Sequence, residues 1–504
     1  MKKLLALALV LTLAFSVCAS TVIAEDLTEN RPTLKFLVGN RTYDPNEDVP
    51  CKNMMELSGY TVVYEMLPSS NGDEKLMLIL AGGEDYDIVE LSTNMFGRLA
   101  TMNVLTDLDD AIAKYGNYLN DATPETVWNT AKDAAGHVVA LPRQMGSDRT
   151  QPYGHRSTSV FMTKIEILDE LGLTVPTDLS SFTQFLETIH DAKNVAPLTA
   201  STLWMKDLMS AFGLPALEWV EDNDGFHSIL DMPAFRDYLA YCADLYKRGL
   251  LDADLPINNA ESVNQKFTTD GAYVSPYAFY DIPSLVSGLT TSGYSTDLVC
   301  FEKPLVGEDG KYVLQTDFGI NKYYGVPAAS SNADHVVNYF NILAEPETFK
   351  ISHIGYEGVH YTVDENGNYN PIFPAFTELN WGNQFSSLQD PAVEYKQWQC
   401  RARKTPEMAV AWEAINSSLK EEEAVFYLNR KTMTNSLEPV KEYSATLTTL
   451  LNDFMMQVVV DGATDDDTFK AFHDRYMSEG GAEMLEAMNE WIKEYPLADV
   501  KVLY

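Results

Sequence analysis

The chain has 504 residues, with 36 Lys and Arg against 73 Asp and Glu and a formal net charge of −37. A field this negative excludes nucleic acid as the expected partner and disfavours direct binding to an anionic membrane surface. With 45% hydrophobic and 11% aromatic residues, the composition is that of a globular protein whose length allows two or three domains.

Residues 1–24 have the pattern of a secretory signal peptide: Lys2 and Lys3, an apolar run over 4–15, and small residues over 16–24. Two processing routes remain open. Cleavage after Ala24 fits a small-x-small site, whereas Cys18 fits a lipidated cysteine. We therefore expect an extracytoplasmic protein, either secreted or periplasmic, or anchored at the cell surface as a lipoprotein.

The mature chain begins with alternating strand and helix patterns. Residues 34–38 and 61–64 predict strands on either side of a helix around 52–57. A second helix over 75–80 ends at Gly82 and Gly83, and residues 86–89 predict a short buried strand. This order indicates a βαβ unit.

Later helices carry clearer apolar periodicity. The spacing of Phe182, Phe185, Leu186 and Ile189 predicts one amphipathic helix. A second, over 336–343, follows Ser331 and Asp334, which are spaced as a capping box. Two apolar stripes over 469–476 and 484–492, separated by Gly480 and Gly481, predict a terminal helical pair.

The four cysteines beyond the signal peptide show neither a dense disulfide framework nor a CxxC metal motif, and we expect isolated buried thiols at Cys51, Cys242, Cys300 and Cys400. The segment 355–369 reads as a hairpin that turns at Asn366-Gly367, with Glu357 and His360 fixing its base. It fails as an EF-hand loop because Tyr369 and Ala375 stand where Gly and Glu are required.

Motifs of catalysis are missing. The sequence has no G-x-S-x-G, Walker loop, G-x-G-x-x-G or H-E-x-x-H. Ser417 to Lys420 matches S-x-x-K without its companion motifs, and the acidic runs 421–423 and 465–467 are typical of solvated helix starts. We expect a protein that is not an enzyme and that needs no cofactor or metal.

Several short motifs, in order, resemble those of one family. They are GGEDYDIV at 82–89, GHVVALP at 136–142, LTVPT at 173–177, the step from Phe267 to Gly271, GVPAASS at 325–331 and GYEGVHY at 355–361. Together they resemble extracellular solute-binding proteins of ABC importers, more narrowly the LipO-like, family 1 oligosaccharide-type group. The likeness covers nearly the whole mature chain.

This resemblance implies an α/β protein of the type II periplasmic-binding-protein fold, with two lobes around a ligand cleft joined by hinge crossings. Its expected boundaries are 31–148 with 318–385 for lobe 1, and 149–317 with 386–504 for lobe 2. The loop 190–197 is shorter than the calcium loop of some relatives, so we expect no metal site there.

The resemblance also implies the function: capture of a carbohydrate, an oligosaccharide, and its delivery to permease subunits by a monomeric binding protein. Candidate ligand-binding residues are Tyr277, Phe279 and Tyr280, the tryptophans Trp204 and Trp381, and the loop residues Arg143 and Asn94. Two alternatives remain: a peptide or other small solute as the ligand, and a secreted polysaccharide-degrading enzyme.

Overall fold

The structure is a computed structural model that describes residues 27–41, 43–145, 159–222, 224–365, 367–378, 388, 391–417 and 420–495. The predicted signal peptide with Cys18, and the candidate Trp381, lie outside these residues. Within the described chain no helix combines the length and the apolar character that crossing a bilayer requires.

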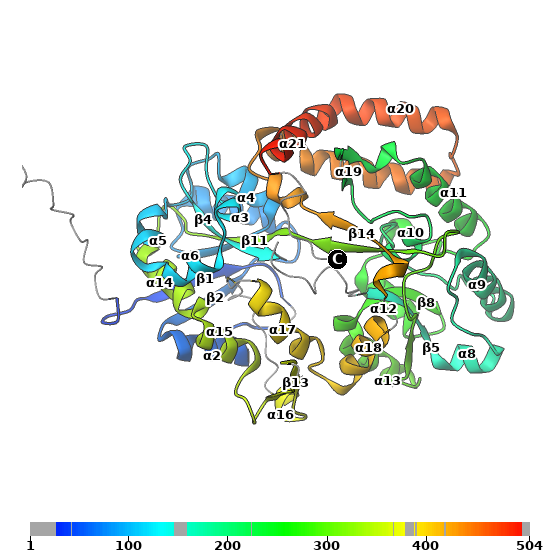
Figure 1. Ribbon diagram of the computed structural model, residues 1–504, viewed down its shortest axis with the longest axis horizontal. Helices are drawn as coiled ribbons and strands as arrows, with labels where there is room; N and C mark the ends of the chain where they lie inside the picture. The colour runs from blue at the N-terminus through cyan, green and yellow to red at the C-terminus, as the bar shows by residue number, and fades with distance from the viewer. Residues whose placement is uncertain are drawn as a thin grey trace, which may run out of the picture.

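A five-stranded sheet forms the centre of the part of the molecule that we call lobe 1 (Figure 1). Most of lobe 1 comes from the N-terminal part of the chain, and β11 with the two helices after it comes from later in the chain. Its strand order is β2-β1-β3-β11-β4, with β1 parallel to β2 and β3, and β11 antiparallel to β3 and β4. The strands are β1 (Thr33–Val38), β2 (Thr61–Met66), β3 (Ile88–Leu91), β4 (Ala140–Met145) and β11 (Gly319–Gly325). The helices are α2 (Val49–Ser58), α3 (Gly72–Gly82), α4 (Thr93–Leu99), α5 (Asp109–Tyr115), α6 (Asn117–Ala122), α7 (Glu125–Asn129), α14 (Ala333–Ala344) and α15 (Pro346–Ile354).

A second core, which we call lobe 2, surrounds a sheet of order β8-β5-β9 in which both pairings are antiparallel. Its strands are β5 (Ser159–Lys164), β8 (Val274–Ala278) and β9 (Leu298–Cys300), with the ribbon β6 (Trp219–Asp222) and β7 (Gly225–Ser228) beside them. Its helices are α8 (Ile165–Leu171), α9 (Leu179–Lys193), α10 (Lys206–Ser210), α11 (Pro233–Lys247), α12 (Ala260–Phe267), α13 (Ile282–Ser292), α18 (Pro406–Ser417), α19 (Glu438–Asp461), α20 (Asp466–Tyr476) and α21 (Ala482–Glu494). Short turns are η2 (Ile229–Asp231), η3 (Leu255–Ile257), η4 (Phe279–Asp281), η5 (Glu421–Glu423), η6 (Lys431–Thr434) and η7 (Met477–Gly481).

The segment predicted as a hairpin forms one, outside both sheets. β12 (Tyr361–Val363) pairs antiparallel with β13 (Tyr369–Pro371), and α16 (Ala375–Glu378) and α17 (Pro391–Ala402) follow. At its base the backbone N–H of Tyr356 donates to Nδ1 of His360 (2.9 Å), as expected for a structural histidine.

The lobes are joined where the chain passes from one sheet to the other. β10 (Tyr312–Asp317) runs parallel to β14 (Ala424–Asn429) in lobe 2, and residue 318 leads directly into β11 of lobe 1. The N–H of Phe318 donates to the Asn429 carbonyl (2.9 Å), and the N–H of Ile320 donates to Oγ1 of Thr432 (2.9 Å). Figure 1 shows β14 and β11 between the two bodies of the molecule.

The predicted pattern of strands and helices is confirmed, as is the two-lobe α/β fold. The buried face of α9 consists of Phe182, Phe185, Leu186 and Ile189. All four cysteines in the described chain are buried free thiols. The precise lobe boundaries stay a prediction.

The prediction of a capping box at Ser331 and Asp334 before α14 is wrong. The helix begins after Asn332, which makes no side-chain cap. The amide of Asn332 instead donates to Oδ1 of Asp87 (2.9 Å), and the hydroxyl of Ser330 donates to the same oxygen (2.7 Å). Asp87 is 3% exposed, and its buried carboxylate accepts from both side chains, which ties the segment before α14 to the start of β3.

Candidate ligand-binding site

A pocket of about 280 Å³ lies at one edge of the lobe 2 sheet. Leu198 bridges Val274 in parallel, so the segment 199–204 leaves the sheet at the same edge as the carboxyl end of β8. Ser159 pairs with Ala278, which brings the start of β5 to this edge as well. Its lining is Ser159, Ala200, Ser201, Thr202, Trp204, Lys206, Asp207, Ala260, Val263, Asn264, Ser275, Pro276, Tyr277, Ala278, Tyr280 and Asp281.

Three of the aromatic residues predicted from the sequence meet in this pocket: Trp204, Tyr277 and Tyr280. The indole N–H of Trp204 donates to Oδ1 of Asn452 (2.7 Å), and its ring stacks on Phe235 at 6.2 Å, so its orientation is fixed. Tyr280 is 63% exposed, which leaves its ring available to a ligand. A sugar ring has an apolar face that packs on such a surface.

Phe279 is placed differently. Its ring is 3% exposed and makes edge-to-face contacts with Trp398 (5.5 Å) and Trp412 (5.2 Å). The η4 turn thus sends Phe279 into the lobe 2 core and its neighbour Tyr280 to the surface. We assign Phe279 a packing role beneath the pocket.

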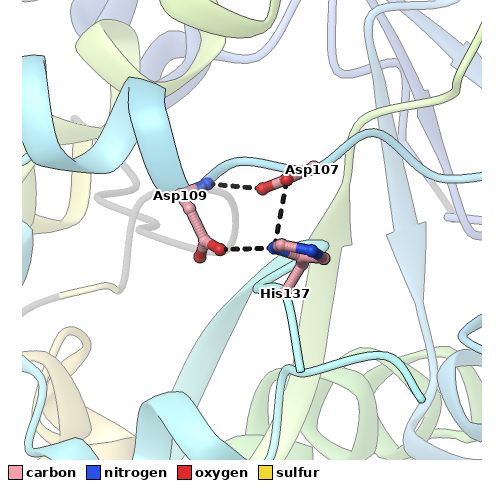
Figure 2. Close-up of side chains that lie close together, drawn as sticks. All are labelled: Asp107, Asp109 and His137. Atoms are coloured by element: carbon pink, nitrogen blue, oxygen red, sulfur yellow. Dashed lines mark hydrogen bonds and ion pairs between the residues drawn. The ribbon is translucent and has the colours of Figure 1, made fainter. Parts of the chain in front are cut away.

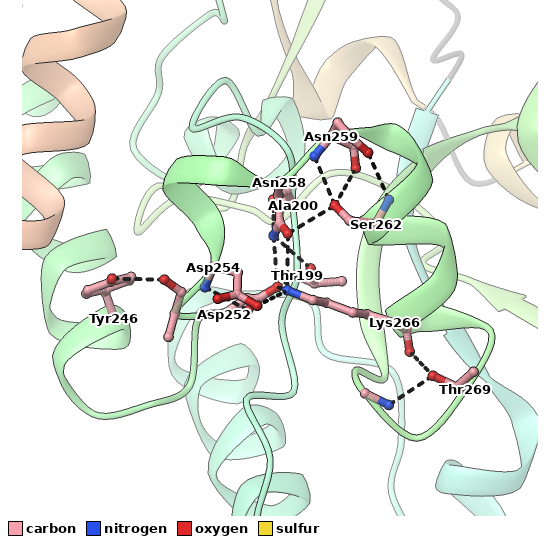
Figure 3. Close-up of polar contacts among 12 residues, drawn as sticks. Thr199, Ala200, Tyr246, Asp252, Asp254, Asn258, Asn259, Ser262, Lys266 and Thr269 are labelled. Carbon is pink, nitrogen blue, oxygen red and sulfur yellow. Dashed lines mark hydrogen bonds and ion pairs between the residues drawn. The ribbon is translucent and has the colours of Figure 1, made fainter.

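A polar network braces the pocket wall (Figure 3). The carboxylate of Asp252 accepts hydrogen bonds from Thr199 (2.7 Å), Asn258 (2.8 Å) and Lys266 (2.6 Å). The Asn258 amide also donates to the Ala200 carbonyl (3.1 Å), which connects the network to the lining. Burial would raise the pKa of Asp252, but the hydrogen bonds from Lys266 and its neighbours hold it below its usual value.

Two carboxyl groups in the pocket were missed by the sequence analysis. Oδ2 of Asp281 accepts a hydrogen bond from the Ala278 N–H (2.9 Å), and burial raises its pKa. Asp207 is 2% exposed, and burial raises its pKa to about 7. Asp281 directly follows Tyr280, so a sequence signal existed for it, whereas no motif singled out Asp207.

Arg143 lies on β4 of lobe 1, outside this pocket. Its Nη1 donates to Oδ1 of Asn321 (3.0 Å), and in register it faces Lys322. Arg41 and Lys322 both contact the Glu90 carboxylate, at 2.7 Å and 3.2 Å. Burial lowers the pKa of Lys322, and the charges of Arg143 and Arg41 lower it further, so these residues form one cation-rich cluster on the lobe 1 sheet.

Asn94 is separate from both groups. It lines a narrow crevice of about 40 Å³ between α4 and α19, together with Gly97, Lys441 and Ser444. The structure therefore brings together three of the predicted residues, and it places Arg143 and Asn94 at two other positions on lobe 1.

The exposed side chains of Asp107, Asp109 and His137 could supply metal ligands (Figure 2). Nδ1 of His137 lies 2.8 Å from Asp109 and 3.2 Å from Asp107, and Asp109 Oδ1 also accepts from the Val138 N–H (3.1 Å). The cluster ties the turn at 133–137 to the start of α5. We interpret it as a structural ion-pair cluster, because these contacts already use the ligand atoms.

Comparison with solved structures supports the fold. The chain is similar to the Streptococcus pneumoniae ABC-transporter substrate binding protein FusA in complex with kestose, with a TM-score of 0.66 and 16% identity over 93% of this chain and 100% of that one. This likeness establishes the two-lobe fold of binding proteins.

Comparisons of the sequence agree with this fold. Residues 51–276 match the model of the family of bacterial extracellular solute-binding proteins, in agreement with the resemblance. The chain is 25% identical over 264 residues to an uncharacterised protein of Niallia circulans, covering 51% of this chain and 98% of that protein. It is 20% identical over 340 residues to the polygalacturonan/rhamnogalacturonan-binding protein YtcQ of Bacillus subtilis, covering 64% and 66%.

Proposed function

We propose that this protein is the substrate-binding component of an ABC importer that captures an oligosaccharide outside the cell and delivers it to permease subunits. The observation that carries the proposal is the pocket where Trp204, Tyr277 and Tyr280 meet beside buried polar groups. Aromatic faces with polar groups at their edge are what a sugar ring requires. The names of FusA with kestose and of YtcQ support a carbohydrate ligand.

Capture requires binding without turnover. The ligand would lie between the pocket and lobe 1, and closure of the lobes about β10, β11 and β14 would present a liganded shape to the permease. The protein would act as a monomer outside the cytoplasm, after cleavage behind Ala24 or lipidation at Cys18.

The test is isothermal titration of the protein spanning 25–504 with neutral and acidic oligosaccharides and with short peptides. We expect binding of one glycan series. Tyr280→Ala should weaken it roughly 10-fold, since an aromatic contact contributes about 0.5–1.5 kcal/mol beyond the area it buries. Tyr356→Ala is the matched control, because Tyr356 is also exposed (50%) but lies on the hairpin.

Binding of peptides alone would replace carbohydrate with peptide as the ligand. Release of shortened glycans during the titration would contradict a pure binding function. If Tyr280→Ala and Tyr356→Ala lose glycan affinity equally, the pocket is not the glycan-binding site.

A further inference from the structure

Asp207 differs from the other buried acids of the described chain. Asp87, Glu221 and Asp252 are also less than 9% exposed, and each carboxylate has partners: Ser330 for Asp87, Arg430 for Glu221 and Lys266 for Asp252. Neither carboxylate oxygen of Asp207 has a hydrogen-bond partner among the residues that the structure describes. An unsatisfied buried acid is costly and calls for a functional explanation.

The backbone around Asp207 is firmly held, so the position of its side chain is not an accident of a loose loop. The Asp207 carbonyl accepts from the Leu305 N–H (3.2 Å). Three residues on, the Ser210 hydroxyl donates to the Leu305 carbonyl (2.9 Å) and accepts from the Val313 N–H (2.8 Å). These bonds fix α10 against the chain that leads into β10 and hold Asp207 among the residues that line the pocket.

The surroundings of this carboxylate indicate the kind of group that would satisfy it. Ser275 and Tyr277 are buried, line the same pocket and carry hydroxyl groups that have no hydrogen-bond partner among the described residues. A ligand hydroxyl can donate to Asp207 and at the same time accept from Ser275 or Tyr277. A ligand carboxylate has no proton to donate, so it cannot satisfy an ionised Asp207, and the two like charges would repel each other in a poorly solvated pocket.

We propose that Asp207 accepts hydrogen bonds from ligand hydroxyls, so that the pocket selects an uncharged sugar unit and rejects a carboxylated one. This inference rests on the proposed carbohydrate function and makes it more specific. It assigns Asp207 as the residue that determines specificity, with Tyr280 and Trp204 providing the apolar contacts.

The test compares wild-type protein with Asp207→Asn, which keeps the shape but removes the charge. Glu218→Gln is the matched control: Glu218 is a partly buried carboxylate that accepts hydrogen bonds from Tyr476 (2.6 Å) and Thr448 (2.7 Å) and does not line the pocket. The probes are maltotriose, xylotriose, kestose and trigalacturonate. If Asp207→Asn does not fold, Asp207→Ser takes its place.

We expect wild-type protein to bind a neutral probe more tightly than trigalacturonate. Asp207→Asn should weaken that binding 10-fold or more, as expected for a hydrogen bond to a charged group, while Glu218→Gln changes it less than 2-fold. Preference for trigalacturonate would overturn the inference. Unchanged affinity in Asp207→Asn would overturn it and leave the proposed function standing. Binding of no saccharide by folded wild-type protein would overturn both.

Discussion

The carboxyl group of Asp207 makes the stability of the protein depend on pH. Burial raises its pKa from 3.8 to about 7, and the nearby charge of Lys206 opposes this effect. Between these pH values the folded state binds more protons than the unfolded state, so the free energy of unfolding falls as pH rises. The slope is about 1.4 kcal/mol per pH unit, a total on the order of 4 kcal/mol.

Asp207→Asn should therefore gain stability relative to wild type as pH rises from 4.5 to 7.5. Urea denaturation at several pH values measures this difference. Wild type should lose stability with rising pH because of this one residue. If the free energy of unfolding depends on pH in the same way in both proteins, Asp207 is not a buried acid that titrates in this range.

At the same scale, the sequence predicted three of the pocket residues because aromatic side chains stand out in a motif. It could not predict Asp207, which is one of 73 acidic residues and is distinguished only by its burial. It also could not separate Phe279 from Tyr280. Their opposite directions depend on the η4 turn, which no periodicity encodes.

At the scale of elements, the polar network behind the pocket wall makes a measurable contribution to the free energy of unfolding. Lys266 on α12 contacts Asp252 at 2.6 Å and Asp254 at 2.9 Å, and the Asp252 side chain is 11% exposed. Lys266→Met should lower the free energy of unfolding by about 2–3 kcal/mol, because it leaves the buried charge of Asp252 without its cation. Chemical denaturation measures the loss.

The matched control is Lys470→Met. Lys470 is 73% exposed and pairs with Asp474 at 2.6 Å, and exposed pairs of this kind contribute about 0–1 kcal/mol. Equal effects of the two substitutions would show that the network in Figure 3 adds nothing beyond a surface ion pair.

His137 connects the turn at 133–137 with α5 through charge. Its hydrogen bond to Asp109 raises its pKa, with a further contribution from Asp107. This stabilisation is fully present below the unfolded pKa of about 6.5 and is lost as pH rises through the higher folded value. Asp109→Asn should lower the pKa of His137, which NMR titration of its ring protons measures. An unchanged midpoint would show that the contact does not form in solution.

The helices themselves were predictable where apolar residues recur with helical period, as in α9 and α21. The parallel pair β10 and β14 was not predicted, since more than 100 residues separate the strands and neither carries a strong alternating pattern. The capping box predicted for α14 was wrong for a related reason: the segment before the helix is held by Asp87, which is far away in sequence.

For the molecule as a whole, the prediction that each lobe is built from separate stretches of the chain came from the resemblance to a family. The hydrophobic pattern alone does not show which strands share a sheet. The structure adds how the lobes are joined. Gly319 sits where β10 passes into β11, and a Cβ at this position would collide with the Thr432 hydroxyl. That hydroxyl accepts the Ile320 N–H, so any side chain here pushes two joining segments apart.

Gly319→Ala should therefore change the closure of the lobes more than the pocket itself. Small-angle X-ray scattering of wild-type protein should show a smaller radius of gyration when the bound sugar is added, and this decrease should be reduced or lost in Gly319→Ala. The sugar should also bind the variant more weakly, because part of its binding free energy comes from closure. Gly72→Ala is the control, since a Cβ there meets its nearest neighbour, Leu67, at an ordinary 3.7 Å. If Gly319→Ala closes as wild type does, this crossing is not where the lobes bend.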